Sequence, residues 1–186
     1  MFLFLISSVI GFAHSSAKDD LNYIENYYDT TDVFNMHYGK LKLSFNVKSE
    51  MNENIDSNYF RTALLEYKDS IDHKLNCPDV KTKENSIILV NKTHLDYWIN
   101  NTGTFKVYRE KDLWGMIATY DNKSRNTIFI CGDCGNDIKV TFIHELTHLL
   151  GNYCENIDNS EMTAKFYEKN YVEHLTHDMV VKNNNF

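Results

Sequence analysis

Residues 138–151 predict a buried α-helix that carries two histidines on one face. His144 and His148 are four residues apart, so their side chains lie one above the other on such a helix. Asn136 and Asp137 offer an N-cap, and Gly151 stands where a C-cap glycine is expected. The apolar contacts around the helix come from Ile138, Val140, Phe142, Ile143, Leu146, Leu149 and Leu150.

The pentapeptide His144-Glu145-Leu146-Thr147-His148 is typical of a catalytic zinc site. Two imidazoles on one helical face can bind a single zinc ion. Glu145 is rotated away from the histidine pair, yet it is close enough to hold a water molecule at the metal and to accept its proton. The sequence therefore predicts zinc peptidase chemistry. The alternative is a core helix with two polar surface histidines.

The chain length and charge restrict the other classes of function. With 186 residues, the chain can form one domain with a substantial core. Its net charge of −7 and its lack of a basic run argue against nucleic acid or an anionic membrane as a partner. Residues 1–17 are predicted to be a secretory signal, because two short apolar stretches precede small residues, although Lys and Arg are missing there. The domain would then span residues 18–186, and no other segment resembles a transmembrane helix.

The cysteines and the glycosylation motifs agree with secretion. Four cysteines are typical of disulfides in an oxidising compartment. Three pairings are open, but the predicted helix is about 20 Å long, which makes a bond from Cys154 to Cys131 or Cys134 difficult. The acceptor motifs for N-linked glycans begin at Asn91, Asn100 and Asn122.

Two other uses of the cysteines are less favoured. Cys131-Gly132-Asp133-Cys134 follows a predicted strand, as a thioredoxin-type redox motif does. That fold needs a cis-proline downstream of the motif, and the only proline, Pro78, lies upstream. A structural zinc bound by all four cysteines would need a more regular spacing.

The order of predicted elements indicates an α+β protein. Residues 18–39 are polar and rich in tyrosine, without clear periodicity. Strands are predicted at 40–48, 86–90, 104–108, 113–120 and 126–131, the last two joined by a polar turn at 121–125. Helices are predicted at 59–75, 94–100, the histidine-bearing segment and about 160–180. We expect one domain with a small mixed sheet, an active-site helix and a C-terminal ligand helix.

Three residues compete to be the third zinc ligand. A catalytic zinc ion usually takes three protein ligands and leaves a fourth position open. Glu161 is preferred, because a chain that turns back after Gly151 would bring it to the histidines, and the small Ala164 would allow close helix packing. Asp158 is the second candidate and is equally suited to cap the final helix. Cys154 is the third, although a secreted cysteine is more often half of a disulfide.

Each candidate resembles a different class of zinc peptidase. Glu161 and Ala164 resemble the Glu-x-x-Ala ligand helix of gluzincins. Asp158 follows the pentapeptide at the short range seen in aspzincins, but the glycine-threonine and tyrosine signature of that class is missing. Residues 144–154 resemble the metzincin pattern HExxHxxGxxH, with cysteine in place of the last histidine and no obvious Met-turn.

A longer resemblance is to the mitochondrial ATP-synthase-processing metallopeptidases. It is carried by Tyr120-Asp121, 128–131, 140–148 and Ser160-Glu161-Met162-Thr163-Ala164, about a third of the chain. The loop between His148 and Glu161 is shorter here, and a secretory signal departs from that family. The resemblance implies a zincin-like domain with a gluzincin-like site, but not the substrate of that family.

We therefore expect a secreted zinc-dependent endopeptidase. One zinc ion would be held by His144, His148 and Glu161, with Glu145 as general base. The expected partner is a protein or peptide substrate, without nucleic acid or a membrane span, and the protein is expected to be a monomer. A catalytically inactive, secreted zincin-like binding protein is the alternative, but the intact Glu145 argues against it.

Two further features of the catalytic site are left open. A second donor for the oxyanion is expected among the residues that follow the histidines. The candidates are Tyr153, Tyr167, Tyr171, His174 and His177. A strand at 86–90 or 126–131 could pair with the backbone of the substrate.

Overall fold

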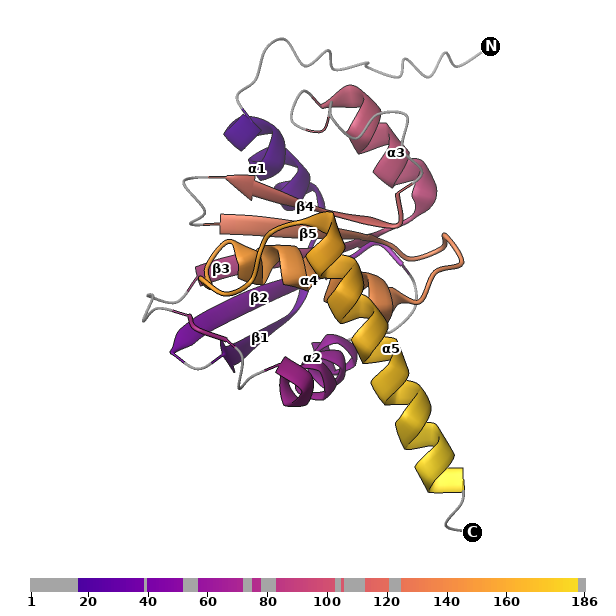
Figure 1. Ribbon diagram of the computed structural model, residues 1–186. Coiled ribbons are helices and arrows are strands. Elements are labelled where there is room, and N and C mark those ends of the chain that lie inside the picture. Colours follow the sequence, from indigo (N-terminus) through magenta and orange to yellow (C-terminus); the bar gives the residue numbers. More distant parts are fainter. Residues whose placement is uncertain are drawn as a thin grey trace, which may run out of the picture.

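A five-stranded mixed sheet with five helices forms the part of the chain that the computed structural model describes (Figure 1). The described residues are 17–38, 40–51, 57–71, 75–77, 83–102, 105, 113–120 and 125–183. The strands are β1 (Thr30–Tyr38), β2 (Leu41–Ser49), β3 (Lys83–Val90), β4 (Gly115–Tyr120) and β5 (Arg125–Cys131). The helices are α1 (Ala17–Tyr27), α2 (Ser57–Ile71), α3 (Lys92–Asn101), α4 (Ile138–Gly151) and α5 (Glu161–Asn183).

The sheet has parallel strands at its centre and antiparallel strands at its edges. Its strand order is β1-β2-β3-β5-β4. β2, β3 and β5 are parallel, whereas β1 pairs with β2, and β4 with β5, in the antiparallel sense. The predicted mixed sheet is confirmed. Because β5 leads directly into α4, the order of the strands puts the edge strand β4 beside the histidine-bearing helix.

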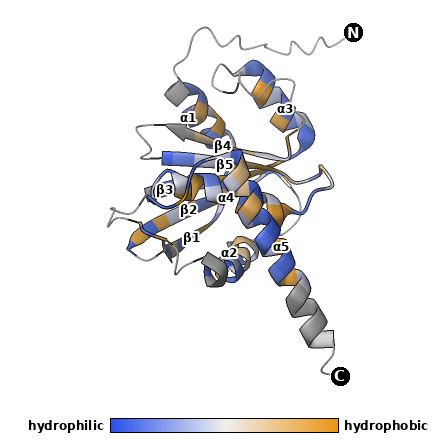
Figure 2. Ribbon diagram, viewed as in Figure 1, coloured by the Kyte–Doolittle hydropathy of each residue, from blue (hydrophilic) through white to orange (hydrophobic). Residues whose placement is uncertain are grey.

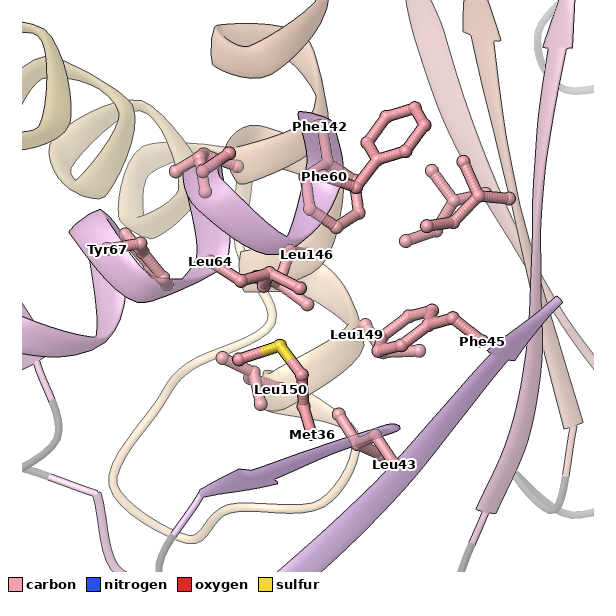
Figure 3. Packing of buried hydrophobic residues seen from close by; sticks show 14 of the residues in the cluster. Met36, Leu43, Phe45, Phe60, Leu64, Tyr67, Phe142, Leu146, Leu149 and Leu150 are labelled. Atoms are coloured by element: carbon pink, nitrogen blue, oxygen red, sulfur yellow. The ribbon is translucent and has the colours of Figure 1, made fainter. Parts of the chain in front are cut away.

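Helices cover both faces of the sheet. α1 and α3 pack on one face, and α2, α4 and α5 pack on the other. Hydrophobic and hydrophilic residues alternate around α3, as expected for a helix with one buried face that includes Leu95, Trp98 and Ile99 (Figure 2). The core under α4 joins side chains of α2, α4, β1 and β2 (Figure 3). Those labelled there are Met36, Leu43, Phe45, Phe60, Leu64, Tyr67, Phe142, Leu146, Leu149 and Leu150.

The polar segment at the start of the described chain forms α1 and β1, which the sequence pattern does not reveal. α1 buries the polar side chain of Glu25 together with its apolar residues. Glu25 accepts hydrogen bonds from Arg125 and Thr127 on β5, and Lys48 Nζ donates to the Glu25 carbonyl at 2.6 Å. The buried face of α1 therefore includes the carboxylate of Glu25, whose partner Arg125 is 100 residues away in the sequence. A polar residue on the buried face obscures the apolar periodicity of the helix.

The other predicted elements agree with the structure apart from their ends. α2 ends at Ile71, before the predicted limit of 75, and α3 is longer than predicted. The strand predicted at 104–108 lies outside the described residues except Phe105, which is a buried turn residue. The turn at 121–124, the predicted signal before Ala17 and Asn122 also lie outside them. No helix in the described part is both long and apolar enough to cross a membrane.

Two disulfides account for the four cysteines. Cys77 pairs with Cys154, and Cys131 pairs with Cys134. The first bond ties residues 75–77, beyond α2, to the connecting loop between α4 and α5 (residues 152–160). Backbone contacts reinforce this tie, because Glu155 N–H donates to the Asn76 carbonyl at 3.1 Å. The four-cysteine zinc site is therefore wrong.

The two disulfides should differ in their effect on stability. Cys77→Ser with Cys154→Ser should lower the free energy of unfolding by about 4 kcal/mol, because the bond joins residues 77 apart. The Cys131–Cys134 bond closes a much smaller loop, because its cysteines are 3 residues apart. Cys131→Ser with Cys134→Ser should therefore lower the free energy of unfolding by about 2 kcal/mol. Urea denaturation of both double variants measures the difference, and equal costs would contradict the expectation.

Candidate metal centre

α4 is held so that its apolar face meets the core and its histidine face is turned away from it. The Asp137 carboxylate caps the helix, accepting from Lys139 N–H at 2.8 Å and Val140 N–H at 3.2 Å, as predicted. On the side of α4 that faces α2, the Thr147 hydroxyl contacts Tyr67 Oη at 2.7 Å. These contacts fix the rotation of the helix about its axis. The His144 and His148 rings consequently lie side by side, with centroids 5.1 Å apart.

Gly151 has a different role from the predicted C-cap. It is the last residue of α4, and Asn152 is the C-cap in a right-handed helical conformation. A Cβ at position 151 would lie 2.9 Å from Cα of Asn159. The glycine therefore allows the connecting loop to approach the end of the helix, where the Asn159 carboxamide reaches His148.

Glu161 is the third residue of the centre. It begins α5, whose N-terminus is capped by Ser160, because Ser160 Oγ accepts from Thr163 N–H at 3.3 Å. Its two carboxylate oxygens face the two histidines, with 3.4 Å to His144 Nε2 and 3.5 Å to His148 Nε2. The three ligand atoms lie within 4.8 Å of one another.

The two competing ligands are placed elsewhere. Cys154 is bonded to Cys77 and has no free thiolate to offer. Asp158 is exposed and does not belong to the group formed by the histidines and Glu161. Ala164 is fully buried, as its expected role in close packing of α4 and α5 requires.

Each histidine is oriented by a partner that the sequence does not reveal. His144 Nδ1 lies 2.8 Å from Glu168 Oε2, and His148 Nδ1 lies 2.9 Å from Asn159 Oδ1. Glu168 Oε2 and Asn159 Oδ1 are acceptors, so in the neutral tautomer that a metal ligand needs, each Nδ1 would carry the proton and each Nε2 would present its lone pair to the shared centre. Glu168 lies two helical turns after Glu161, so both residues are on the same face of α5. This spacing was the one sequence feature that could have indicated a role for Glu168 beside the histidines.

The donor set fits a zinc ion. Two imidazole nitrogens and one carboxylate are the ligands of a known class of catalytic zinc site, in which a fourth position is left for water or substrate. Partial burial opposes ionisation of Glu161, but His144, His148 and Lys165 outweigh it and lower the pKa of this carboxyl below its usual value. An ionised carboxylate is the form that binds a metal.

Glu145 is buried beside this centre. Its side chain lies against Gly115 of β4. A Cβ added at Gly115 would be 3.2 Å from Glu145 Oε1 and 2.7 Å from Thr141 Cγ2. Burial is the largest cause that raises the pKa of Glu145 to about 8, followed by the negative charges of Glu161 and Glu168. A carboxyl with a pKa near neutrality is suited to general acid–base chemistry.

A groove of about 820 Å³ runs over the centre between β4 and α5. Within the described chain, β4 is an edge strand. Trp114 uses its carbonyl to pair with β5, accepting from Cys131 N–H at 2.7 Å. Backbone groups alternate in direction along an antiparallel strand, so those of Gly115 point toward the open edge. β3 and β5, the strands favoured from the sequence for substrate pairing, are interior, and that expectation is wrong.

The tyrosines expected to stabilise the oxyanion make contacts away from the groove. The Tyr153 hydroxyl accepts from Asn126, and the Tyr171 hydroxyl donates to Glu66 at 2.7 Å. Tyr167 packs against Tyr67, with ring centroids 6.0 Å apart. None of these three, nor His174, lines the groove as far as the described residues define it, and the side chain of His177 lies outside them.

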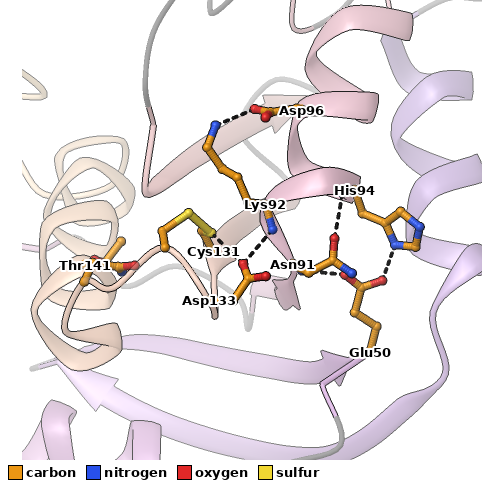
Figure 4. Close-up of a disulfide and its surroundings, with 10 residues drawn as sticks. Glu50, Asn91, Lys92, His94, Asp96, Cys131, Asp133 and Thr141 are labelled. Carbon is orange, nitrogen blue, oxygen red and sulfur yellow. Dashed lines mark hydrogen bonds and ion pairs between the residues drawn. A yellow bond between two sulfur atoms is a disulfide. The ribbon is translucent and has the colours of Figure 1, made fainter.

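A second group of ligand atoms lies at the start of the loop before α4. Cys131, Asp133 and Cys134 are close together, but the two sulfurs are joined in a disulfide (Figure 4). Asp133 Oδ1 accepts from Lys92 N–H at 2.7 Å, which ties the loop to the start of α3. This group anchors the loop that leads to the cap of α4 and offers no thiolate to a metal.

Comparison of the chain with protein-family models, curated proteins and solved structures finds no match. The chemical interpretation of the centre therefore depends on its geometry and donor atoms.

The raised pKa of Glu145 predicts a pH-dependent stability of the metal-free protein. Between the usual pKa of 4.5 and about 8, the unfolded chain has lost this proton while the folded chain keeps it. The free energy of unfolding should therefore fall as pH rises through this range. Glu145→Gln removes the titration, so its stability relative to the unsubstituted protein should rise from pH 5 to pH 8. Urea denaturation in the presence of a chelator measures this, and a constant difference would contradict it.

Proposed function

We propose that this protein is a zinc-dependent metalloendopeptidase with a gluzincin-like site. The observation that carries the proposal is the convergence of His144 Nε2, His148 Nε2 and the Glu161 carboxylate in a groove. The buried Glu145 lies next to them, between the centre and an open strand edge. A surface pair of histidines would have no need for a third ligand, a buried base and an adjacent groove together.

The residues of the centre divide the chemistry among them. His144, His148 and Glu161 hold the zinc ion, and Glu168 and Asn159 keep the two rings in orientation. Zinc, when bound, polarises the peptide carbonyl as a Lewis acid and makes water more acidic. Glu145 takes the proton from the attacking water and passes it to the leaving amine.

A peptide substrate would bind along β4. The outward backbone groups of Gly115 offer an N–H and a carbonyl to an extended chain, which would lie beside Glu145. Gly115 keeps this edge next to the base, because any side chain would contact Thr141 and Glu145. We propose an unmodified extended segment of a protein or peptide as the substrate, cleaved by a secreted enzyme. The two disulfides support secretion.

Zinc affinity tests the choice of the third ligand. Glu161→Ala should weaken zinc binding by more than the 10- to 100-fold that is roughly typical for loss of an outer-sphere partner. Asp158→Ala removes one carboxylate from the nearby loop and should leave the affinity unchanged. Competition with a chromophoric chelator measures both variants. If Asp158→Ala loses zinc and Glu161→Ala keeps it, the assigned ligand is wrong.

Activity toward a mixed peptide library tests the general base. A chelator should abolish cleavage and zinc should restore it. Glu145→Gln should retain zinc but lower kcat by about 10²- to 10⁴-fold, because it cannot accept a proton. Glu173→Gln, which changes an exposed glutamate on α5, is the matched control and should behave as the unsubstituted protein. Equal cleavage by Glu145→Gln would refute the mechanism, and a zinc-loaded protein without any cleavage would favour a binding protein instead.

A further inference from the structure

Peptide hydrolysis develops a negative charge on the carbonyl oxygen, and the groove offers few groups that could balance it. Of the tyrosines that the sequence suggested for this role, Tyr153 and Tyr171 are hydrogen-bonded elsewhere, and Tyr167 packs against Tyr67. Among the described residues that line the groove, Lys165 is the single lysine or arginine. The acidic residues of the same lining are Asp137, Glu145, Glu161 and Glu168. Within this described lining, the ammonium group of Lys165 therefore shares the groove with four acidic residues, and we asked what it could bind.

Lys165 lies next to the metal ligands. Its Nζ is 3.5 Å from Glu161 Oε1, the oxygen that lies 3.4 Å from His144 Nε2. Glu161, Lys165 and Glu168 are spaced by four and three residues, so they share the face of α5 that borders the groove. A pocket for a neighbouring substrate side chain would lie a residue further along the strand, about 3.3 Å away. Nζ therefore lies one carboxylate oxygen away from the histidine pair, where a group bound at the centre would come within its reach.

We propose that Lys165 forms an anion subsite of the metal centre and contacts the oxyanion during peptide hydrolysis. The catalytic part of this assignment rests on the proposed function. When Glu161 gives its carboxylate to a cation, the ammonium group is no longer held by that charge and can turn to an oxygen anion in the groove. An ammonium on a flexible side chain can follow this change without movement of the backbone.

A neighbouring pair on the same helix shows what an ordinary surface contact looks like. Lys169 Nζ and Glu173 Oε1 are 3.6 Å apart at the same four-residue spacing, and neither residue lines the groove. Such exposed pairs contribute little to stability. Lys165 and Lys169 thus carry the same charge on the same helix and each pairs with a glutamate four residues away. Lys165 pairs with Glu161 and lines the groove, whereas Lys169 does neither. Lys169 is the matched control for Lys165.

The test measures anion binding and catalysis separately on the zinc-loaded protein. Inorganic phosphate is the tetrahedral anion, titrated by calorimetry, and zinc content is determined for each variant. Lys165→Met should retain zinc and weaken phosphate binding by about 10-fold or more, and it should lower kcat by roughly 10- to 100-fold with little change in KM. Lys165→Arg should recover much of both losses, and Lys169→Met should match the unsubstituted protein.

The outcomes separate this assignment from the proposed function. Equal phosphate affinity in Lys165→Met and the unsubstituted protein, or no phosphate binding by either, overturns the anion subsite even if peptides are cleaved. Phosphate binding that depends on Lys165 without any peptide cleavage supports the subsite and overturns the peptidase. A rise in KM with an unchanged kcat would make Lys165 a substrate-binding residue and would overturn its role at the oxyanion.

Discussion

The close packing of α5 on α4 is the constraint on which the candidate centre depends. Ala164 on α5 is fully buried, and Gly151 lets Asn159 approach the end of α4. A larger side chain at either position would need space that neighbouring atoms occupy. The Glu161 oxygens lie only 3.4 and 3.5 Å from the two histidines, so a shift of one or two ångströms would separate the three ligand atoms. Two small residues therefore determine whether a metal can be held.

The same packing creates a second requirement, which concerns charge. Glu145, Glu161 and Glu168 are brought together with two histidines, and the burial of Glu145 makes its ionisation costly. Without a cation, burial and the charges of Glu161 and Glu168 keep Glu145 protonated up to about pH 8, so the folded chain loses stability as the pH rises toward that value. A divalent ion would reverse the sign of this interaction. The chain thus gives up stability at the point where the proposed chemistry needs a positive charge, as is common at functional sites.

The sequence predicted what depends on local spacing and missed what depends on tertiary contacts. The histidine pair, the cap at Asp137 and the helix that begins near Glu161 follow from intervals of three or four residues, and the structure has them in the predicted places. Glu168 and Asn159 could not be assigned, because their role appears only when α5 and the connecting loop meet α4. β4 was predicted as a strand, but its position at the edge is a property of the sheet order. α1 was missed because Glu25 is paired with Arg125 across the sheet.

The bond between Cys77 and Cys154 has a consequence for the dynamics of the centre. It fixes the connecting loop to residues 75–77, after α2, so the chain that leads into α5 is tethered close to the start of that helix. Opening of α5 would then have to proceed from its C-terminal end, which extends beyond the body of the molecule (Figure 1). Amide exchange should be slower in the turns of α5 that follow its first turn and pack on α4 than toward its C-terminal end. The end of α5 could then fray while Glu161 stays beside the two histidines, so that opening of the helix and dispersal of the candidate centre would be separate events.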